Sequence, residues 1–158
     1  MVKIQVIRLQ PSAILPTYQT EHSAGMDLHA CIDQPITLQP LERAMVGTGL
    51  AIELPPGYEA QIRARSGLSI KHGLTMVNGI GTIDADYRGE VAALVVNLGS
   101  DDFVIEPNMR IAQMVISKYE TAAWQLVDGL GQTNRGQGGM GSTGVSSPLT
   151  TRQKDTKI

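Results

Sequence analysis

The chain has 158 residues, of which 42% are hydrophobic and 18% charged, so it is long enough for one domain with its own core. Lysine and arginine number 13 against 15 aspartates and glutamates, and the net charge of −2 argues against bulk attraction to nucleic acid or anionic membrane. The only cysteine, Cys31, excludes an internal disulfide and fits a reducing compartment. Because the N-terminus lacks a signal-peptide pattern and no apolar run approaches membrane-spanning length, we expect a cytoplasmic protein with no nucleic-acid or membrane partner.

Hydrophobic residues alternate with polar ones along most of the chain, which is typical of strands with one buried face. In chain order the predicted strands are Val2–Leu9, Met26–Ala30, Ile36–Leu38, Met45–Leu54, Tyr58–Arg65, Leu74–Val77, Val91–Leu98, Phe103–Ile105, Ile111–Tyr119 and Trp124–Val127. Clusters of glycine, proline, asparagine and aspartate separate most of them, and one or two helical turns fit only around Ser66–His72. The pattern predicts an all-β sandwich or barrel.

The composition changes after Gly129. The segment from Gly131 to Gly144 is rich in glycine and contains one large apolar residue, Met140, so it cannot order through a core of its own. A frayed terminus is the simpler interpretation, and an arm that orders against a ligand or a neighbouring subunit is the alternative. We therefore predict a β domain over residues 1–128, a glycine-rich arm over 129–145 and a disordered tail over 146–158.

Three groups of residues are candidates for chemistry. Polar residues stand at predicted strand ends or turns, namely Asp27, Asp84, Asp86 and Gln113. Arg65-Ser66-Gly67 places a guanidinium, a hydroxyl and a flexible backbone in succession, and a glycine-rich stretch follows Arg135. Arginine and exposed backbone N–H groups bind phosphate oxygens, whereas the glycine-rich stretch fits neither the Walker nor the dinucleotide-binding pattern. Each residue alone is more often a turn residue or a surface charge, but together they suggest a polyphosphate ligand.

Five short segments occur in order along the chain: Ala24-Gly25-Met26-Asp27-Leu28, Arg65-Ser66-Gly67-Leu68, Gly81 to Gly89, Arg110-Ile111-Ala112-Gln113-Met114 and Arg135 to Gly144. Together they resemble the five motifs of the trimeric dUTP diphosphatase (dUTPase) family, over about Val2 to Gly144. The resemblance implies a jelly-roll-type β-barrel and a homotrimer whose active sites are shared between subunits. It also implies Mg²⁺-dependent hydrolysis of dUTP to dUMP and pyrophosphate, with the ion held mainly by the triphosphate and water.

The resemblance also implies roles for individual residues. Asp84 matches the base that deprotonates the water attacking the α-phosphorus, and Asp27 matches a residue that supports this arrangement. The phosphate-binding groups would be Arg65, Ser66, Gly67 and Gln113, and the uracil pocket would contain Asn78, Thr82, Ile83 and Ala92. Tyr87 matches the ring that packs under deoxyribose and blocks a 2′-hydroxyl. The fifth motif, which closes over the nucleotide from another subunit, includes Arg135, Met140, Gly141 and Ser142.

Three positions depart from the family pattern. Ala64 replaces the usual proline before Arg65, and Asn108-Met109 replaces a glycine and an acidic residue before Arg110. Asparagine tolerates the left-handed conformation, so we expect the Asn108 turn to survive. Met140 replaces a phenylalanine over the uracil ring, and its smaller stacked area predicts a weaker nucleotide cap.

Other functions stay open at this point. The same fold supports a dCTP deaminase or a bifunctional deaminase–diphosphatase, which release of ammonia from dCTP would identify. A non-catalytic relative that binds a protein is a second alternative, although the intact Asp84 and Arg65-Ser66-Gly67 argue against it. A general nucleotide-binding module is a third, and it would bind UTP and dTTP as well as dUTP.

Overall fold

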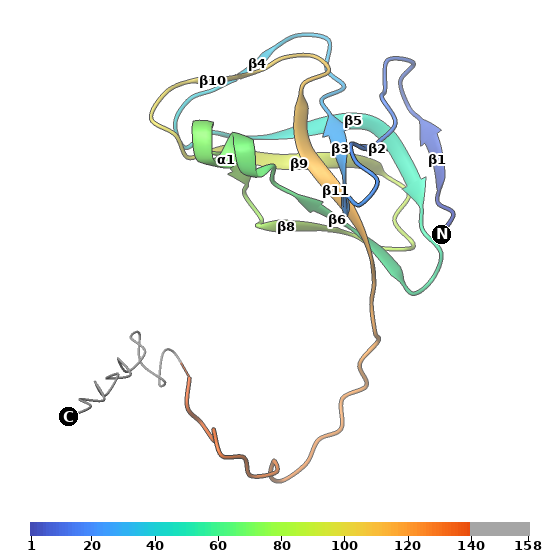
Figure 1. Ribbon diagram of the computed structural model, residues 1–158, viewed down its shortest axis with the longest axis vertical. Coiled ribbons are helices and arrows are strands. Elements are labelled where there is room, and N and C mark those ends of the chain that lie inside the picture. Colours follow the sequence, from blue (N-terminus) through green and yellow to red (C-terminus); the bar gives the residue numbers. More distant parts are fainter. Residues whose placement is uncertain (140–158) are drawn as a thin grey trace, which may run out of the picture. The chain divides into compact units, whose positions relative to one another are not determined.

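The computed structural model describes residues 1–139, and Figure 1 shows the arrangement of the strands. Contacts divide the chain into Met1–Thr121 and a second unit that begins at Ala122. Among the described residues, the strands all lie in the first unit: β1 (Gln5–Arg8), β2 (Thr17–Tyr18), β3 (Gly25–His29), β4 (Ile36–Leu38), β5 (Arg43–Glu53), β6 (Tyr58–Arg63), β7 (Leu74–Met76), β8 (Ile80–Ile83), β9 (Glu90–Asn97), β10 (Phe103–Ile105) and β11 (Arg110–Lys118). The predicted all-β fold is confirmed.

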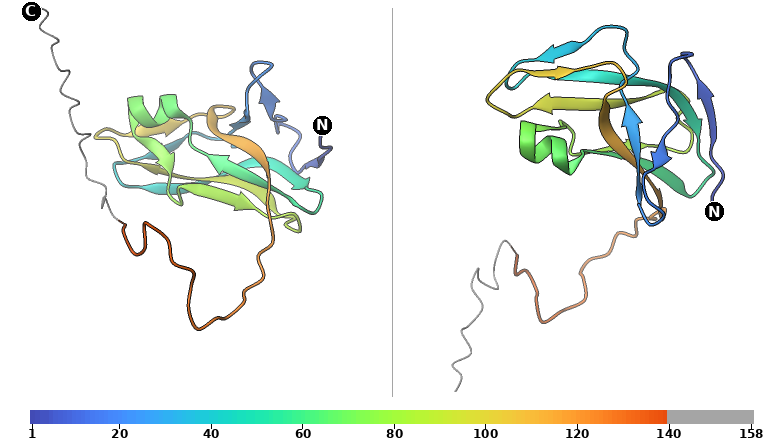
Figure 2. Two further views of the ribbon diagram at one scale, coloured as in Figure 1. Left: turned by 60° about the horizontal axis from the view of Figure 1, so that its bottom comes forward. Right: turned by 45° about the horizontal axis from the view of Figure 1, so that its top comes forward.

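The strands form two main sheets and a separate pair. The first sheet has the order β1-β5-β9-β7, the second has the order β2-β3-β11-β6-β8, and β4 pairs with β10. In Figures 1 and 2, β4 and β10 lie at the end of this unit away from β1. Strands that are distant in sequence become neighbours, and the pairing of β3 with β11 sets Asp27 opposite Gln113.

The core lies between the two main sheets and is made of alternate residues along their strands. Val46 and Val91 come from the first sheet, whereas Leu28 and Ile62 come from the second, and all four are at most 1% exposed. Burying one such side chain contributes roughly 1.5–3 kcal/mol relative to leaving it exposed. Cys31 packs as a small apolar residue, as predicted, in a separate cluster with Ala13 and Leu50.

One helix, α1 (Ser66–His72), connects β6 to the turn before β7, and its bounds agree with the predicted helical turns. It starts after Arg65, is capped at its C-terminal end by Gly73 and has no fully buried residue, although Leu68 packs against the core. No helix among residues 1–139 is long and apolar enough to cross a membrane.

The predicted strand at Trp124–Val127 is wrong. These residues are irregular, and the side chains of Trp124 and Leu126 are 97% and 100% exposed. Apolar alternation makes a strand only where a partner strand accepts the backbone hydrogen bonds, and within the described residues this segment has none. Two strands also escaped prediction: β2 has only two residues, and Gly81 interrupts the pattern of β8.

The turn before β11 is preserved despite its unusual sequence. Asn108 has a φ of 62°, as expected for an asparagine in the place of a glycine, and its N–H donates to the carbonyl of Ala30 at 2.9 Å. The Met109 carbonyl accepts from the Ala30 N–H at 2.8 Å. Two hydrogen bonds therefore join the turn to Ala30 at the end of β3, and Arg110 follows the turn next to that strand.

Candidate active site

A cavity of about 260 Å³ opens where β3, β11 and the start of α1 meet. Its lining is almost wholly polar: Gln19, Ser23, Gly25, Asp27, Arg65, Ser66, Gly67, Arg110 and Gln113. The two-residue period of a strand places Gly25 and Asp27 on the same side of β3, and register places Gln113 of β11 opposite Asp27. The cavity thus gathers four predicted phosphate-binding residues together with Asp27.

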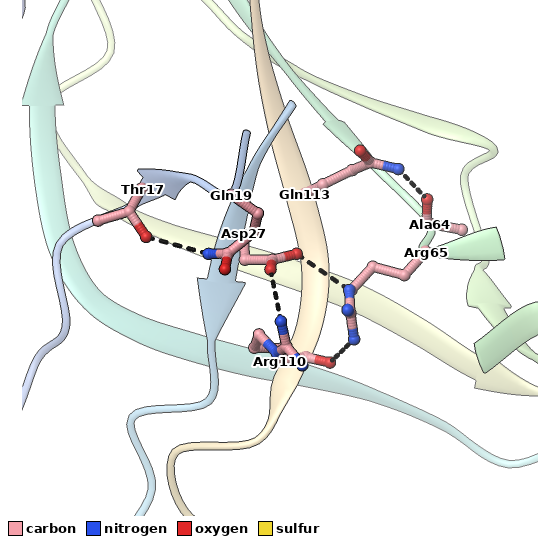
Figure 3. Close-up of polar contacts among 7 residues, drawn as sticks. All are labelled: Thr17, Gln19, Asp27, Ala64, Arg65, Arg110 and Gln113. Atoms are coloured by element: carbon pink, nitrogen blue, oxygen red, sulfur yellow. Dashed lines mark hydrogen bonds and ion pairs between the residues drawn. The ribbon is translucent and has the colours of Figure 1, made fainter. Parts of the chain in front are cut away.

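Asp27 joins two arginines inside this cavity (Figure 3). Its Oδ1 lies 3.0 Å from Nε of Arg65, and its Oδ2 lies 3.1 Å from Nη1 of Arg110. Nη1 of Arg65 also donates to the backbone carbonyl of Arg110 at 3.0 Å. Because two guanidinium groups face one carboxylate, the cluster is net positive and its planar donors suit phosphate oxygens.

Gln113 is fixed by two neighbours. Its Nε2 donates to the Ala64 carbonyl at 2.9 Å, directly before Arg65 (Figure 3). A methyl group at Gly25 would overlap Oε1 of Gln113 and lie 3.2 Å from its Cδ. The absence of a side chain at position 25 therefore leaves the space that the Gln113 amide occupies.

His29 lies beside the arginine cluster and lacks a hydrogen bond on its Nδ1 within the described part of the chain. It is paired with Arg110 between β3 and β11. Burial lowers the pKa of His29 below its ordinary value; the Asp27 carboxylate opposes this, while Arg110 and Arg65 add to it. The neutral imidazole is consequently favoured next to the two guanidinium groups.

A second cavity, of about 300 Å³, is formed by residues of β5, β6, β7, β8 and β9 and of the turns that follow β7 and β8. Its walls are mainly apolar with a few polar groups, a composition typical of small-molecule sites. It is lined by Met45, Ile62, Met76, Asn78, Gly81, Thr82, Ile83, Asp84, Tyr87, Glu90, Ala92 and Leu94. Among the residues that the sequence predicts for the uracil and the sugar, Asn78, Thr82, Ile83, Tyr87 and Ala92 lie together here with the predicted base Asp84.

The loop after β8 is tightly bonded and carries Asp84 and Tyr87. The Tyr87 N–H donates to the Asp84 carbonyl at 3.2 Å. Nη1 of Arg88 donates to the carbonyls of Ala85 and Tyr87 at 2.8 and 3.0 Å, and its Nη2 lies 3.2 Å from a carboxylate oxygen of Glu53. The Asp84 carboxylate itself makes no hydrogen bond with the described residues, so it is available to accept a proton.

Arg65 and Asp84 line different cavities of the chain. Arg135 belongs to the second unit, where its Nε donates to the Gly138 carbonyl at 2.7 Å and closes a local turn. Met140, Gly141 and Ser142 lie outside the described residues. Across positions 1–139 no three histidine, cysteine, aspartate or glutamate side chains are grouped closely enough to hold a metal ion.

Several lining residues were missing from the predicted site. Gln19, Ser23 and Arg110 join the first cavity, and Met45 and Glu90 join the second. Arg110 had a usable signal, since it stands three residues before Gln113 in the fourth motif. The others depend on strand register and loop placement, which no local pattern reveals.

The sequence model of the dUTPase family matches residues 11–144, a span that contains all the described lining residues of both cavities. The chain belongs to the dUTPase family. The five motifs read from the sequence therefore indicated this dUTPase membership correctly.

Individual members of the dUTPase family resemble the chain closely. A deoxyuridine 5′-triphosphate nucleotidohydrolase of Rickettsia felis is 59% identical over 134 residues, which cover 85% of this chain and 90% of the relative. The protein of the same name from Rickettsia bellii is 60% identical over 131 residues, covering 83% and 87%. The solved structure of the Staphylococcus bacteriophage 80alpha dUTPase with dUPNHPP aligns with a TM-score of 0.82 at 27% identity, covering 90% of this chain and 99% of that chain.

Proposed function

We propose that the chain hydrolyses dUTP to dUMP and pyrophosphate, which keeps uracil out of DNA and supplies dUMP for thymidylate synthesis. One observation carries the proposal: the dUTPase family model matches residues 11–144, which include the described lining of both cavities. The 59% identity to a deoxyuridine 5′-triphosphate nucleotidohydrolase over 85% of this chain supports it. The chemistry of the two cavities agrees with it, since one suits phosphate and the other suits a base and sugar.

Asp84 is the general base of this reaction. It follows β8 directly, borders the cavity of Asn78 and Tyr87, and has a carboxylate without a hydrogen bond in the described residues. A water oxygen bonds to the α-phosphorus, the bond from that phosphorus to the bridging oxygen of pyrophosphate breaks, and the water proton passes to Asp84. A positioned carboxylate is sufficient, because phosphoryl transfer depends mainly on alignment and charge neutralisation.

The first cavity binds the triphosphate. Arg65 and Gln113 supply a guanidinium and an amide, and Ser66 and Gly67 supply a hydroxyl and backbone N–H groups. Asp27 acts through Arg65 by fixing the orientation of its guanidinium at 3.0 Å. Donors that are held in place before the substrate binds stabilise transition-state charge without reorganisation.

The second cavity selects the base and the sugar. Asn78, Thr82, Ile83 and Ala92 surround the uracil, and Tyr87 packs against deoxyribose. A site that pairs with the O4 and N3–H of uracil leaves its groups unpaired against cytosine, whose N4 donates instead. The turn between β7 and β8, together with β8, excludes the thymine methyl group by steric overlap.

The complete site forms between copies of the chain in a homotrimer. The support for this is the placement of Arg65 and Asp84 in separate cavities of one chain. The fifth motif closes over the nucleotide and includes Arg135, Met140, Gly141 and Ser142. A random mixture of Asp84→Asn and Arg65→Ala copies should regain about a quarter of wild-type activity, because one site in four combines intact residues from two chains. Mixtures with no recovery would contradict a shared site.

Mg²⁺ is held mainly by phosphate oxygens and water. Both carboxylate oxygens of Asp27 already contact guanidinium groups, and residues 1–139 contain no group of three potential ligands. This donor set fits an ion that keeps most of its waters and binds through substrate phosphates, with at most one or two carboxylates. When bound, the ion neutralises negative charge on the phosphates.

The deciding experiment measures pyrophosphate release from dUTP, dTTP, dCTP and UTP with and without Mg²⁺, together with ammonia release from dCTP. We expect release from dUTP alone, dependent on Mg²⁺. Ammonia from dCTP would identify a deaminase, and comparable turnover of UTP or dTTP would identify a general nucleotide hydrolase. Binding of dUTP without turnover would indicate a non-catalytic relative.

A further inference from the structure

Gly89 lies directly against the tip of the Tyr87 ring. A methyl group at position 89 would overlap the Tyr87 hydroxyl and would lie 2.5 Å from Cζ and 3.0 Å from Cε2 of the same ring. These three ring atoms are the nearest neighbours of such a methyl group. The space that a side chain would occupy at position 89 is therefore occupied by Tyr87.

The backbone supplies no other reason for glycine at this position. The described glycines with a positive φ are Gly49, Gly57, Gly73, Gly79 and Gly136, so Gly89 has a conformation open to other residues. The nearest obstacle to a side chain at position 89 is therefore the side chain of Tyr87.

The contact determines where the ring lies. The Tyr87 hydroxyl donates to the Glu90 carbonyl at 3.2 Å, and the ring lines the second cavity opposite Asn78 and Ala92. Tyr87 is nevertheless 44% exposed, so its side chain can rotate toward solvent. A methyl group at Gly89 would push the ring tip away and leave the backbone of the loop in place, since the atoms that it meets belong to a mobile side chain.

We propose that Gly89 is a specificity-determining position, because its lack of a side chain allows the Tyr87 ring to lie in the cavity and exclude ribonucleotides. The inference rests on the proposed function, in which Tyr87 packs against the sugar. Gly89 does not touch the nucleotide and acts through the ring. Displacing the ring creates room beside the sugar for a 2′-hydroxyl.

The test compares kcat/KM for dUTP and UTP in wild type, Gly89→Ala, Tyr87→Ala and the double variant. We expect Gly89→Ala to lower the preference for dUTP over UTP by about tenfold, mainly through KM, because excluding one small group in a pocket is worth roughly 10–200-fold. In the Tyr87→Ala background the ring is absent, so the added methyl group should change the preference by less than about twofold, as expected for coupled neighbours. Thermal unfolding of all four proteins serves as the control.

Every outcome of this comparison bears on the role of Gly89. An unchanged preference in Gly89→Ala overturns the proposal, and so does an equal loss with and without the ring. Failure of Gly89→Ala to fold also overturns it, because the proposal requires the ring to yield while the backbone holds. If the wild-type protein releases no pyrophosphate from dUTP, the proposed function is contradicted instead. Failure of the Gly89 proposal and failure of the proposed function can therefore be distinguished.

Discussion

Replacing Asp27 by asparagine tests whether the arginine cluster is positioned by this carboxylate. The residue is 8% exposed, and each of its oxygens contacts one guanidinium, at 3.0 and 3.1 Å. Asparagine keeps the shape but presents one NH₂ group to a guanidinium, so one contact becomes donor against donor. Arg65 or Arg110 then loses its fixed orientation.

Two effects of Asp27→Asn oppose each other. Loss of a charge-assisted hydrogen bond costs about 1.5–3 kcal/mol, and partial exposure of the side chains of Arg65 (27%) and Arg110 (48%) brings our expectation to the lower end. Removing a negative charge also strengthens attraction to phosphate, but screening limits this gain to less than about 1 kcal/mol. The net loss is then about 0.5–1.5 kcal/mol, so positioning prevails and kcat/KM for dUTP should fall about two- to tenfold, mainly in kcat.

The assay is pyrophosphate release over a range of dUTP concentrations, with circular dichroism to verify folding. Asp33→Asn is the matched control, because Asp33 is exposed and makes no ion pair with the described residues. We expect the control to retain wild-type kcat and KM. A rise in kcat/KM for Asp27→Asn would show that charge outweighs orientation and would refute the reasoning.

Three further predictions each concern one residue. Asp84→Asn should retain dUTP binding while kcat falls by about two orders of magnitude or more, and normal turnover would mean that Asp84 is not the base. Thr48→Val should lower the free energy of unfolding by about 1–2 kcal/mol in urea titrations, because the buried Thr48 hydroxyl donates to the Val91 carbonyl at 2.6 Å; an unchanged urea midpoint would contradict this. The lowered pKa of His29 means that the unfolded chain binds more protons, so wild type should lose stability as pH falls through about 6.5 toward the folded pKa. His29→Gln lacks this component, and an identical pH dependence of unfolding in both proteins would disprove it.

Local periodicity was sufficient to predict most of the fold. The strands Ile36–Leu38 and Phe103–Ile105 and the helix Ser66–His72 have their predicted bounds, because short apolar alternation and turn residues are local signals. Trp124–Val127 has the same alternation and is irregular. A strand depends on its own residues and on a partner strand, and a single segment shows only its own residues.

The predicted site was incomplete for a related reason. The motifs identified Asp27 and Arg65, but the second arginine on Asp27 depends on the register of β3 and β11, which sets Arg110 beside His29. A glycine in the sequence likewise does not reveal why a side chain is absent at that position. Neither Gly25 nor Gly89 has a positive φ, and at each position the side chain of another residue occupies the space that a Cβ would take.

The arginine cluster, which we propose binds the triphosphate, also shows why overall charge is a poor guide to the charge of a single cavity. The chain is acidic overall, with a net charge of −2, yet one small cavity sets two guanidinium groups against one carboxylate. Two guanidinium groups held close together without substrate repel each other, and Asp27 offsets that repulsion while leaving the cluster net positive. An incoming phosphate thus meets donors that are already close together and oriented. The attraction extends only about a Debye length, roughly 8 Å at physiological salt, so it acts on a ligand that has already reached the cavity.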